Sequence, residues 1–289
     1  MPSASSHWSG MSLLWLTNCC FFFSCVNSSP VFTHPGIIVT SKLLQDIKSD
    51  VKAKKNPIYK AYIAAKNHTT MAYGGMPPVK LWDLDYIPHP QLMFSNGSGI
   101  TANREDGLAA YTHALLWFID QDERHAEKSI SILDSWTAIN QPPFDLANGL
   151  QVAWSASEWP RAAEIIRHTY PKQWQGASAF GEWMQKVFVP FVDQGASTNG
   201  NIGLVMTEAA VAIAVYNDNH TLFNTSIDRW RQQAKAYLYI KSDGPTPIRP
   251  PLMRYLAHTW PTCGPNCTDK QIEEYWHYQP DFPQVKSCS

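Results

Sequence analysis

The spacing of apolar residues along the chain predicts a succession of helices. Residues 40–55 place their apolar side chains on one helical face, namely Leu43, Leu44, Ile47 and Val51. The same rhythm recurs in six later stretches, which are residues 103–119, 123–139, 146–169, 174–192, 198–216 and 222–240. In the first of these, the acidic Glu105 and Asp106 are expected in the first turn, where they complement the helix dipole. Thr268 and Gln271 have the spacing of a capping box, which predicts a last short helix.

Two segments do not fit a helical pattern. Residues 72–100 are rich in proline, glycine and aromatic residues, so we expect a long ordered excursion. Residues 243–265 contain six prolines and cannot form a continuous helix. No strand-like alternation stands out. The expected fold class is therefore all-α, either a bundle or a toroid of helical hairpins.

The composition indicates a globular, exported protein. With 289 residues, of which 44% are hydrophobic, the chain can bury a substantial core. Its first thirty residues lack Asp, Glu, Lys and Arg, and residues 11–26 form an apolar run too short for an ordinary membrane span. We expect residues 1–29 to be a signal peptide and residues 30–289 to form one domain, secreted, not membrane-bound and monomeric. Six glycosylation sequons agree with this route, at Asn27, Asn67, Asn96, Asn219, Asn224 and Asn266.

The cysteines predict a disulfide near the C-terminus and no metal site. Beyond the expected signal peptide, the chain has Cys263, Cys267 and Cys288. In an oxidising compartment Cys263 and Cys267 are the candidate pair, which leaves one thiol over. No second pair of ligands follows them, so the spacing is not that of a zinc site.

The most suggestive polar stretch is the one around Asn199 and Asn201, at the mouth of a predicted helix. One reading is an N-cap with an Asn-Gly turn; the other is a pair of amides that bind an acidic ligand. Residues 228–270 carry seven Lys or Arg against three Asp, interleaved with aromatic residues. They form either a solvated face or a surface for a uronic-acid polymer; nucleic acid is not an expected partner of a secreted glycoprotein.

Several motifs, taken in order, resemble the alginate lyase-like superfamily, and secreted fungal members most of all. They are EDGLAAYTHALLW (residues 105–117), ILDSW (132–136), WSASEWPRAAEIIR (154–167), NGN (199–201) and EAAVAIAVY (208–216). The resemblance covers residues 34–278. It implies an incomplete (α/α) toroid and a lyase that cleaves an acidic polysaccharide by β-elimination without a cofactor.

The resemblance also implies roles for particular residues. Asn199 and Asn201 match the segment that neutralises the substrate carboxylate and positions the base, although some relatives have His in place of Asn201. Arg254 and Tyr255 are the candidates for charge and proton transfer, with His258 as a binding residue beside them. Further substrate-binding candidates on inner helices are His113, Gln151, Trp154 and Arg161, and core packing is an alternative role for Trp154.

The C-terminal sequence departs from the family pattern. After Trp276, many relatives continue with a Glu-Thr-x-Arg-Asp-x-x-His segment, whereas this chain ends differently. We therefore expect a C-terminally truncated toroid. A catalytically impaired glycan-binding protein on the same scaffold is the second hypothesis. A glycoside hydrolase is the third, but Glu158 and Glu164, six residues apart, do not share one helical face.

Overall fold

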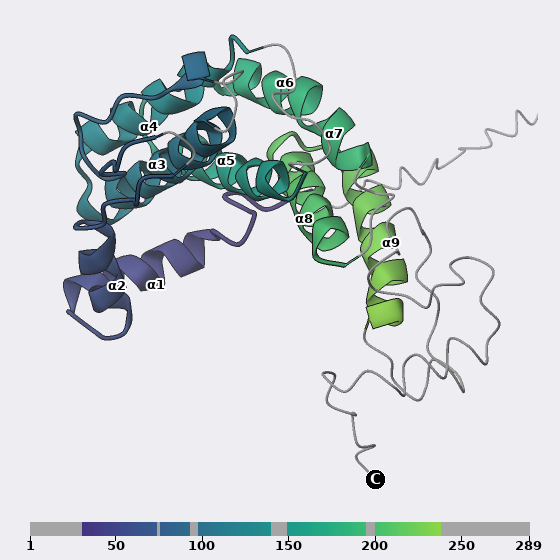
Figure 1. Cartoon of the computed structure of the whole chain (residues 1–289). Helices are drawn as coiled ribbons and strands as arrows, with labels where there is room; N and C mark the ends of the chain where they lie inside the picture. The colour runs from purple at the N-terminus through teal and green to yellow at the C-terminus, as the bar shows by residue number, and fades with distance from the viewer. Residues whose placement is uncertain (1–30, 74–75, 93–97, 140–148, 195–199, 238–289) are drawn as a thin grey trace, which may run out of the picture. The chain divides into compact units, whose positions relative to one another are not determined.

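The computed structural model describes residues 31–73, 76–92, 98–139, 149–194 and 200–237 (Figure 1). Except for Val31, these residues belong to the second of the chain's two units, Phe32–Ser289. The helices are α1 (Ser41–Lys52), α2 (Ile58–Ala65), η1 (Pro90–Leu92), α3 (Ser98–Asp120), α4 (Glu123–Trp136), α5 (Gly149–Thr169), α6 (Ala177–Val187), α7 (Val189–Gln194), α8 (Gly200–Tyr216) and α9 (His220–Tyr237). In the described ranges the extended pairing is limited to an isolated bridge between Tyr73 and Met76. The all-α prediction is confirmed.

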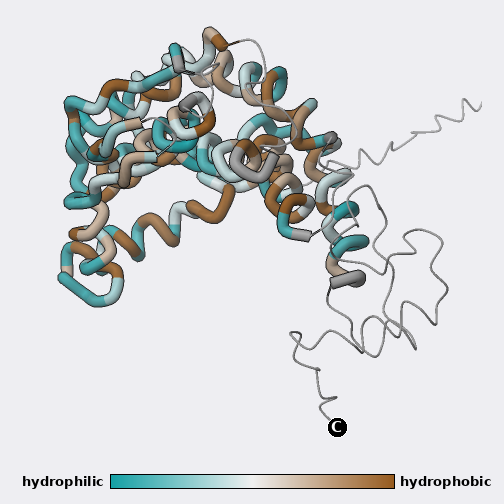
Figure 2. Tube along the Cα trace, in the orientation of Figure 1, coloured by the Kyte–Doolittle hydropathy of each residue, from teal (hydrophilic) through white to brown (hydrophobic). Residues whose placement is uncertain are grey.

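Polar side chains cap the starts of α1, α4 and α9. The Thr40 hydroxyl accepts a hydrogen bond from the Leu43 amide at the start of α1, and the Asp122 carboxylate accepts one from the Arg124 amide at the start of α4. The Asn219 side chain accepts from the Leu222 amide and begins α9. Figure 2 shows hydrophobic and hydrophilic residues alternating along α1, as its amphipathic spacing predicts.

Two boundary predictions are wrong. α3 begins at Ser98 and not at 103, so Glu105 and Asp106 lie in its third turn, where both are buried. The helix expected over residues 174–192 is divided into α6 and α7 at Phe188. Pro190 explains the division, because it lacks an amide hydrogen and its ring clashes with the carbonyl of the preceding turn.

Three inner helices, α3, α5 and α8, run parallel to one another (Figure 1). The Trp117 indole, near the end of α3, donates to the Thr169 hydroxyl at the end of α5. Arg167, also near the end of α5, donates to the carbonyl of Tyr216, the last residue of α8. Buried alanines allow this close approach, namely Ala102, Ala109, Ala110, Ala114, Ala153, Ala156, Ala162, Ala163, Ala209, Ala210 and Ala214.

The outer helices return antiparallel to the inner ones. The indole of Trp136, the last residue of α4, donates to Asp106 in the third turn of α3. The Tyr216 hydroxyl donates to the carbonyl of Ala177, the first residue of α6. The hairpins α3–α4, α5–α6 and α8–α9 therefore repeat one parallel-inner, antiparallel-outer unit. This repeat is compatible with the expected (α/α) toroid.

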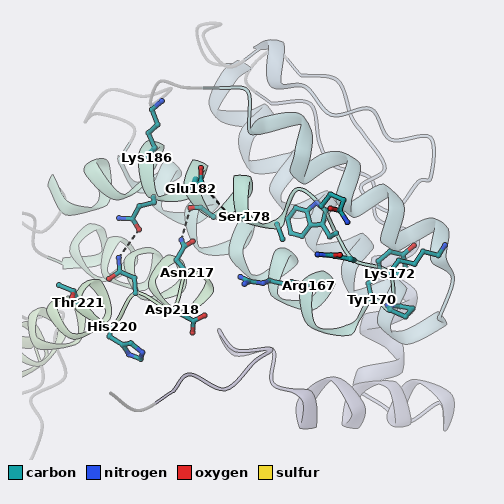
Figure 3. Close-up of a pocket in the computed structure, with 18 residues that line it drawn as sticks. Arg167, Tyr170, Lys172, Ser178, Glu182, Lys186, Asn217, Asp218, His220 and Thr221 are labelled. Carbon is teal, nitrogen blue, oxygen red and sulfur yellow. Dashed lines mark hydrogen bonds between the residues drawn. The ribbon is translucent and has the colours of Figure 1, made fainter. Parts of the chain in front are cut away.

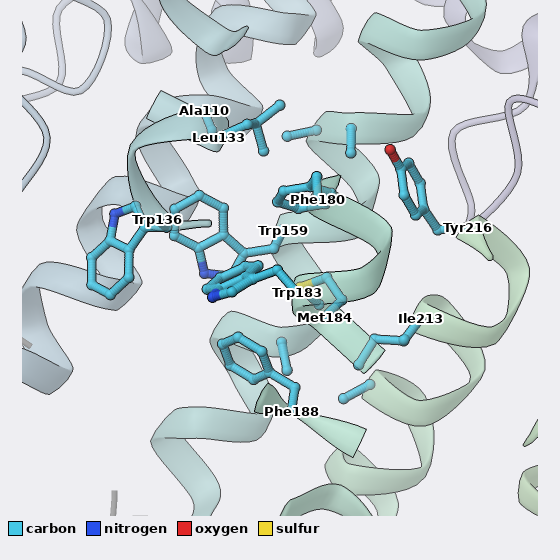
Figure 4. Packing of buried hydrophobic residues seen from close by; sticks show 14 of the residues in the cluster. Ala110, Leu133, Trp136, Trp159, Phe180, Trp183, Met184, Phe188, Ile213 and Tyr216 are labelled. Carbon is cyan, nitrogen blue, oxygen red and sulfur yellow. The ribbon is translucent and has the colours of Figure 1, made fainter. Parts of the chain in front are cut away.

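Aromatic side chains fill the space between the two layers (Figure 4). Trp159 on α5 lies at the centre, with ring centroids 5.6 Å from Trp136 and 5.8 Å from Trp183. Gly107 on α3 faces the same ring, and a Cβ there would lie 3.2 Å from it. A side chain there would require the indole to shift by a few tenths of an ångström, so glycine at this position allows the close spacing between α3 and α5.

The carboxylate of Asp106 holds the excursion between α2 and α3 against the core. Asp106 is fully buried and accepts hydrogen bonds from the Tyr86 hydroxyl at 2.6 Å, the His89 amide at 2.6 Å and the Trp136 indole at 2.7 Å. The excursion predicted over residues 72–100 is non-helical at 72–73 and 76–92 apart from the single turn η1, but the prediction is wrong for residues 98–100, which form the first turn of α3. Within the described ranges, the helices are too short or too polar to span a bilayer.

Candidate functional site

Each of the three inner helices has one row of solvent-accessible side chains, and the three rows are at similar positions along their helices. The rows are spaced like one face of a helix and consist of Arg104, Leu108 and Tyr111 on α3, Trp154, Glu158 and Arg161 on α5, and Asn201, Leu204 and Glu208 on α8. These nine residues are half-buried or exposed, while most of the remaining surface of the three helices is buried. We call them the open face.

An ion pair joins α5 to α8 across the open face. The Arg161 guanidinium donates through Nη2 to Glu208 Oε1. Arg161 is the more buried partner, since 18% of its side chain is exposed against 47% for Glu208. Its Nε is buried without a hydrogen-bond partner among the described residues. The pair therefore holds a guanidinium at the face with donor capacity left for a ligand.

Glu158 lies between the charges of all three inner helices. Burial raises the pKa of its carboxyl to about 7, against the opposing effect of Arg161 and Arg104 and with a further increase from Glu208. Its Oε2 is buried and has no partner within the described ranges. Burial also raises the pKa of the neighbouring Tyr111, whose hydroxyl stays protonated at neutral pH. A carboxyl that titrates near neutrality next to a neutral phenol can exchange protons with a ligand.

The open face continues from α3 into a smaller apolar pocket. The Arg104 guanidinium lies over the Tyr73 ring, 5.3 Å from its centroid. A pocket of about 370 Å³ follows, and its lining includes Tyr73, Arg104 and Leu108. Tyr73 is 59% exposed, so its ring is available to a ligand beside a cation.

The structure brings three of the sequence candidates to the open face. Trp154 is 42% exposed, which excludes core packing as its main role. Asn201 is exposed in the first turn of α8, and Arg161 is half-buried on α5. His113 is elsewhere: it is fully buried on the opposite side of α3, with Nδ1 2.7 Å from His125 Nδ1 on α4. Packing against the outer layer therefore keeps His113 away from the open face.

The other sequence candidates lie outside the described residues. They are Asn199, the side chain of Gln151, Arg254, Tyr255, His258, Cys263 and Cys267. Their roles stay predictions.

The sequence reading missed Arg104, Tyr111, Tyr73 and Glu208, and weighed Glu158 only as half of a hydrolase pair. The first two and Glu208 could have been found from their helical spacing relative to the motifs, whereas Tyr73 carries no such signal. Glu164, the other half of that pair, is fully buried and accepts the Gly36 amide at 2.6 Å. It faces the N-terminal segment and not the open face, so the two carboxyls do not form a hydrolase site.

A larger cleft than the pocket beside Tyr73 is at the other end of the inner helices (Figure 3). It has a volume of about 1330 Å³ and lies between the end of α5, the start of α6 and the α8–α9 turn. Its cations are engaged, because Arg167 donates to the Tyr216 carbonyl and Lys172 is paired with Glu123. None of the sequence candidates lines it. The open face is therefore the better candidate site.

Comparison with known families gives one match, to the family described as Alginate lyase, over residues 53–248. This range includes the whole open face. Neither the curated proteins nor the solved structures contain a match.

Proposed function

Because the chain belongs to the alginate lyase family, we propose that it is a lyase that cleaves a uronic-acid polysaccharide, such as alginate or glucuronan, by β-elimination. The observation that carries the proposal is the open face itself. It combines two guanidinium groups, Arg161 and Arg104, with the carboxyl of Glu158 and the exposed ring of Trp154. A polymer with one carboxylate per sugar offers a complementary charge to the two guanidinium groups and an apolar sugar face to the Trp154 ring.

The chemistry requires three groups and no cofactor. A hydrogen-bonding or cationic group stabilises the negative charge that develops on the substrate carboxylate as the C5 proton leaves. A base accepts that proton, the C4–O4 bond breaks, and an acid protonates the departing O4. The products are a reducing end and a sugar with a new C4=C5 double bond.

We assign these roles as follows. Arg161 and Asn201 contact the substrate carboxylate, and Trp154 stacks against a sugar ring. Asn199 is the second amide of the carboxylate site. Glu158 is the base, since its pKa of about 7 leaves much of it ionised at neutral pH. Tyr255 is the acid and Arg254 supplies charge beside it; Gln151 and His258 complete the binding site.

The purified full-length chain should be incubated with alginate, polyglucuronate and polygalacturonate. Cleavage by β-elimination is expected to raise the ultraviolet absorbance of the unsaturated product with at least one of them. Binding to a polyuronate without any product would instead support the second candidate, a glycan-binding protein. If the chain neither binds nor cleaves any of the polyuronates, both candidate functions are contradicted.

We further propose that the chain enters the secretory pathway and is N-glycosylated. The sequon residues Asn67 and Asn224 are both exposed. A glycan can therefore extend from each of them into solvent. Expression in a eukaryotic host should give a secreted product whose mass falls on treatment with an N-glycosidase. A product that stays in the cytosol and carries no glycan would contradict this.

A further inference from the structure

Two histidines direct ring nitrogens at the same buried carboxylate, remote from the open face. Glu164 on α5 is fully buried, and His168 lies one turn later on the same side of the helix. His34 comes from the segment that precedes α1. Its Nδ1 is 3.0 Å from Glu164 Oε1 and 2.9 Å from Oε2, while His168 Nε2 is 3.6 Å from Oε1. One nitrogen of each histidine and one carboxylate oxygen all lie within 4.8 Å of one another.

These separations match the size of a zinc site. Ligand atoms at about 2.0–2.2 Å from Zn²⁺ in tetrahedral geometry are roughly 3.3 Å apart. The distances of 3.0 and 3.6 Å from Glu164 Oε1 to the two nitrogens lie on either side of this value. The other oxygen, Oε2, accepts the Gly36 amide at 2.6 Å, which fixes the carboxylate and leaves Oε1 for an ion.

Two carboxylates face the two nitrogens of His34. While its Nδ1 faces Glu164, its Nε2 lies 3.2 Å from Asp218 Oδ1. A protonated imidazole donates to both carboxylates, and an ion bound at Nδ1 takes the place of one of these protons while Nε2 still donates to Asp218. Metal-binding histidines commonly donate their second N–H to a carboxylate in this way.

We propose that His34, Glu164 and His168 bind one Zn²⁺, with Asp218 fixing the tautomer of His34 and solvent supplying the fourth ligand. Two imidazoles and one carboxylate suit zinc, whereas Ca²⁺ and Mg²⁺ prefer a set of oxygens. The two imidazole rings are stacked, with centroids 4.6 Å apart and planes 14° from parallel. Since in-plane lone pairs of stacked rings do not converge, zinc binding turns the His168 ring. Its side chain is 26% exposed and has room to turn.

The ion ties three parts of the fold together. His34 belongs to the N-terminal segment, Glu164 and His168 belong to α5, and Asp218 belongs to the α8–α9 turn. These residues lie near the C-terminal ends of α5 and α8, away from Trp154 and Asn201 at the opposite ends. The site therefore stabilises the attachment of the N-terminal segment and does not depend on the proposed lyase activity.

The test uses the full-length chain after treatment with EDTA and removal of the chelator. Titration with ZnCl₂ is expected to show one ion per chain and to raise the melting temperature, whereas CaCl₂ has no effect. His168→Gln keeps the bond between His34 and Glu164, so it is expected to fold but to bind zinc at least about tenfold more weakly. His68→Gln, at an exposed histidine after α2, is the matched control and should bind zinc like the wild type.

Two results would overturn the proposal. One is a melting temperature that zinc does not change, which would mean that a proton on His34 takes the place of the metal. The other is zinc binding of equal strength in His168→Gln and in the wild type, which would place the ion elsewhere. Circular dichroism of each variant before titration separates lost binding from lost folding.

Discussion

The guanidinium of Arg161 on α5 is paired with the carboxylate of Glu208 on α8, and this pair is the direct link between these two rows of the open face. Glu208 is the more exposed partner and can be displaced by the carboxylate of a ligand. Arg161 can then exchange one carboxylate for another with little change in the charge around it. The ion pair thus keeps an arginine oriented for an acidic sugar before the sugar arrives.

Replacing Arg161 by Gln should weaken the action on polyuronates. The variant loses a charge-assisted hydrogen bond of about 1.5–3 kcal/mol, so kcat/KM is expected to fall about 10- to 100-fold. Arg124→Gln is the matched control, because Arg124 is an exposed arginine on the outer helix α4, also paired with an acid. Initial rates from product absorbance measure both. Equal rates for the two variants would exclude Arg161 from the binding site.

Replacing Trp154 by Ala should affect substrate binding much more than stability. Its ring is 42% exposed, so the free energy of unfolding is expected to change by less than about 1 kcal/mol. Loss of the sugar contact, about 1–1.5 kcal/mol, should raise KM roughly tenfold. Ile87→Ala, at an apolar side chain that is 71% exposed and outside the open face, is the control and should leave KM unchanged. A large loss of stability in Trp154→Ala would instead indicate a packing role.

Glu158 should give the reaction its dependence on pH. The base must be ionised, so the wild-type rate is expected to fall as the pH drops through about 7, the pKa of Glu158 among Arg161, Arg104 and Glu208. Glu158→Gln removes the base, and kcat should fall about 10²- to 10⁴-fold. The remaining rate should lack the acid limb. Glu127→Gln, at an exposed glutamate of α4, should keep the wild-type profile. An acid limb that persists in Glu158→Gln would assign the base elsewhere.

The sequence predicted most of the helices, because they depend on local spacing, but it missed α2 and several residues of the open face. The 3.6-residue rhythm of α5 alone places Trp154, Glu158 and Arg161 on one face. The contacts that these residues make with other helices could not be predicted in this way. That Arg161 meets Glu208, 47 residues later, follows from the packing of α5 on α8 through small side chains, and no local pattern encodes it.

His113 illustrates the same limit from the other side. The motif that contains it suggested a groove residue, yet the helix turns His113 toward α4 and not toward the open face. Residues on the open face of α3 are three or four positions apart, as Leu108 and Tyr111 are. His113 is five positions from Leu108 and two from Tyr111, so its side chain lies on another side of the helix. Membership of a motif therefore located the helix correctly but not the side of it.

Asp106 should be essential for stability. Asn at this position replaces an acceptor of three strong hydrogen bonds by a group that also donates, inside a fully buried site. The free energy of unfolding is expected to fall by about 3 kcal/mol in Asp106→Asn. Asp46→Asn, at an exposed ion pair of α1, should change it by less than about 0.5 kcal/mol. Urea titration followed by circular dichroism measures both, and a loss below about 1 kcal/mol for Asp106→Asn would contradict the role.

His113 should make the fold sensitive to acid. Burial, and then the nearby His125, lower its pKa from 6.5 to about 3 in the folded chain. Between these two values the unfolded chain binds a proton that the folded chain does not, so stability falls as the pH drops below 6.5. From about pH 7 to about pH 5 the loss from this residue is about 2 kcal/mol. In His113→Leu the acid-induced loss should be smaller by this amount, whereas exposed His68→Gln should match the wild type. Urea titrations at both pH values measure the difference, and parallel losses in all three proteins would show that His113 is protonated in the folded state.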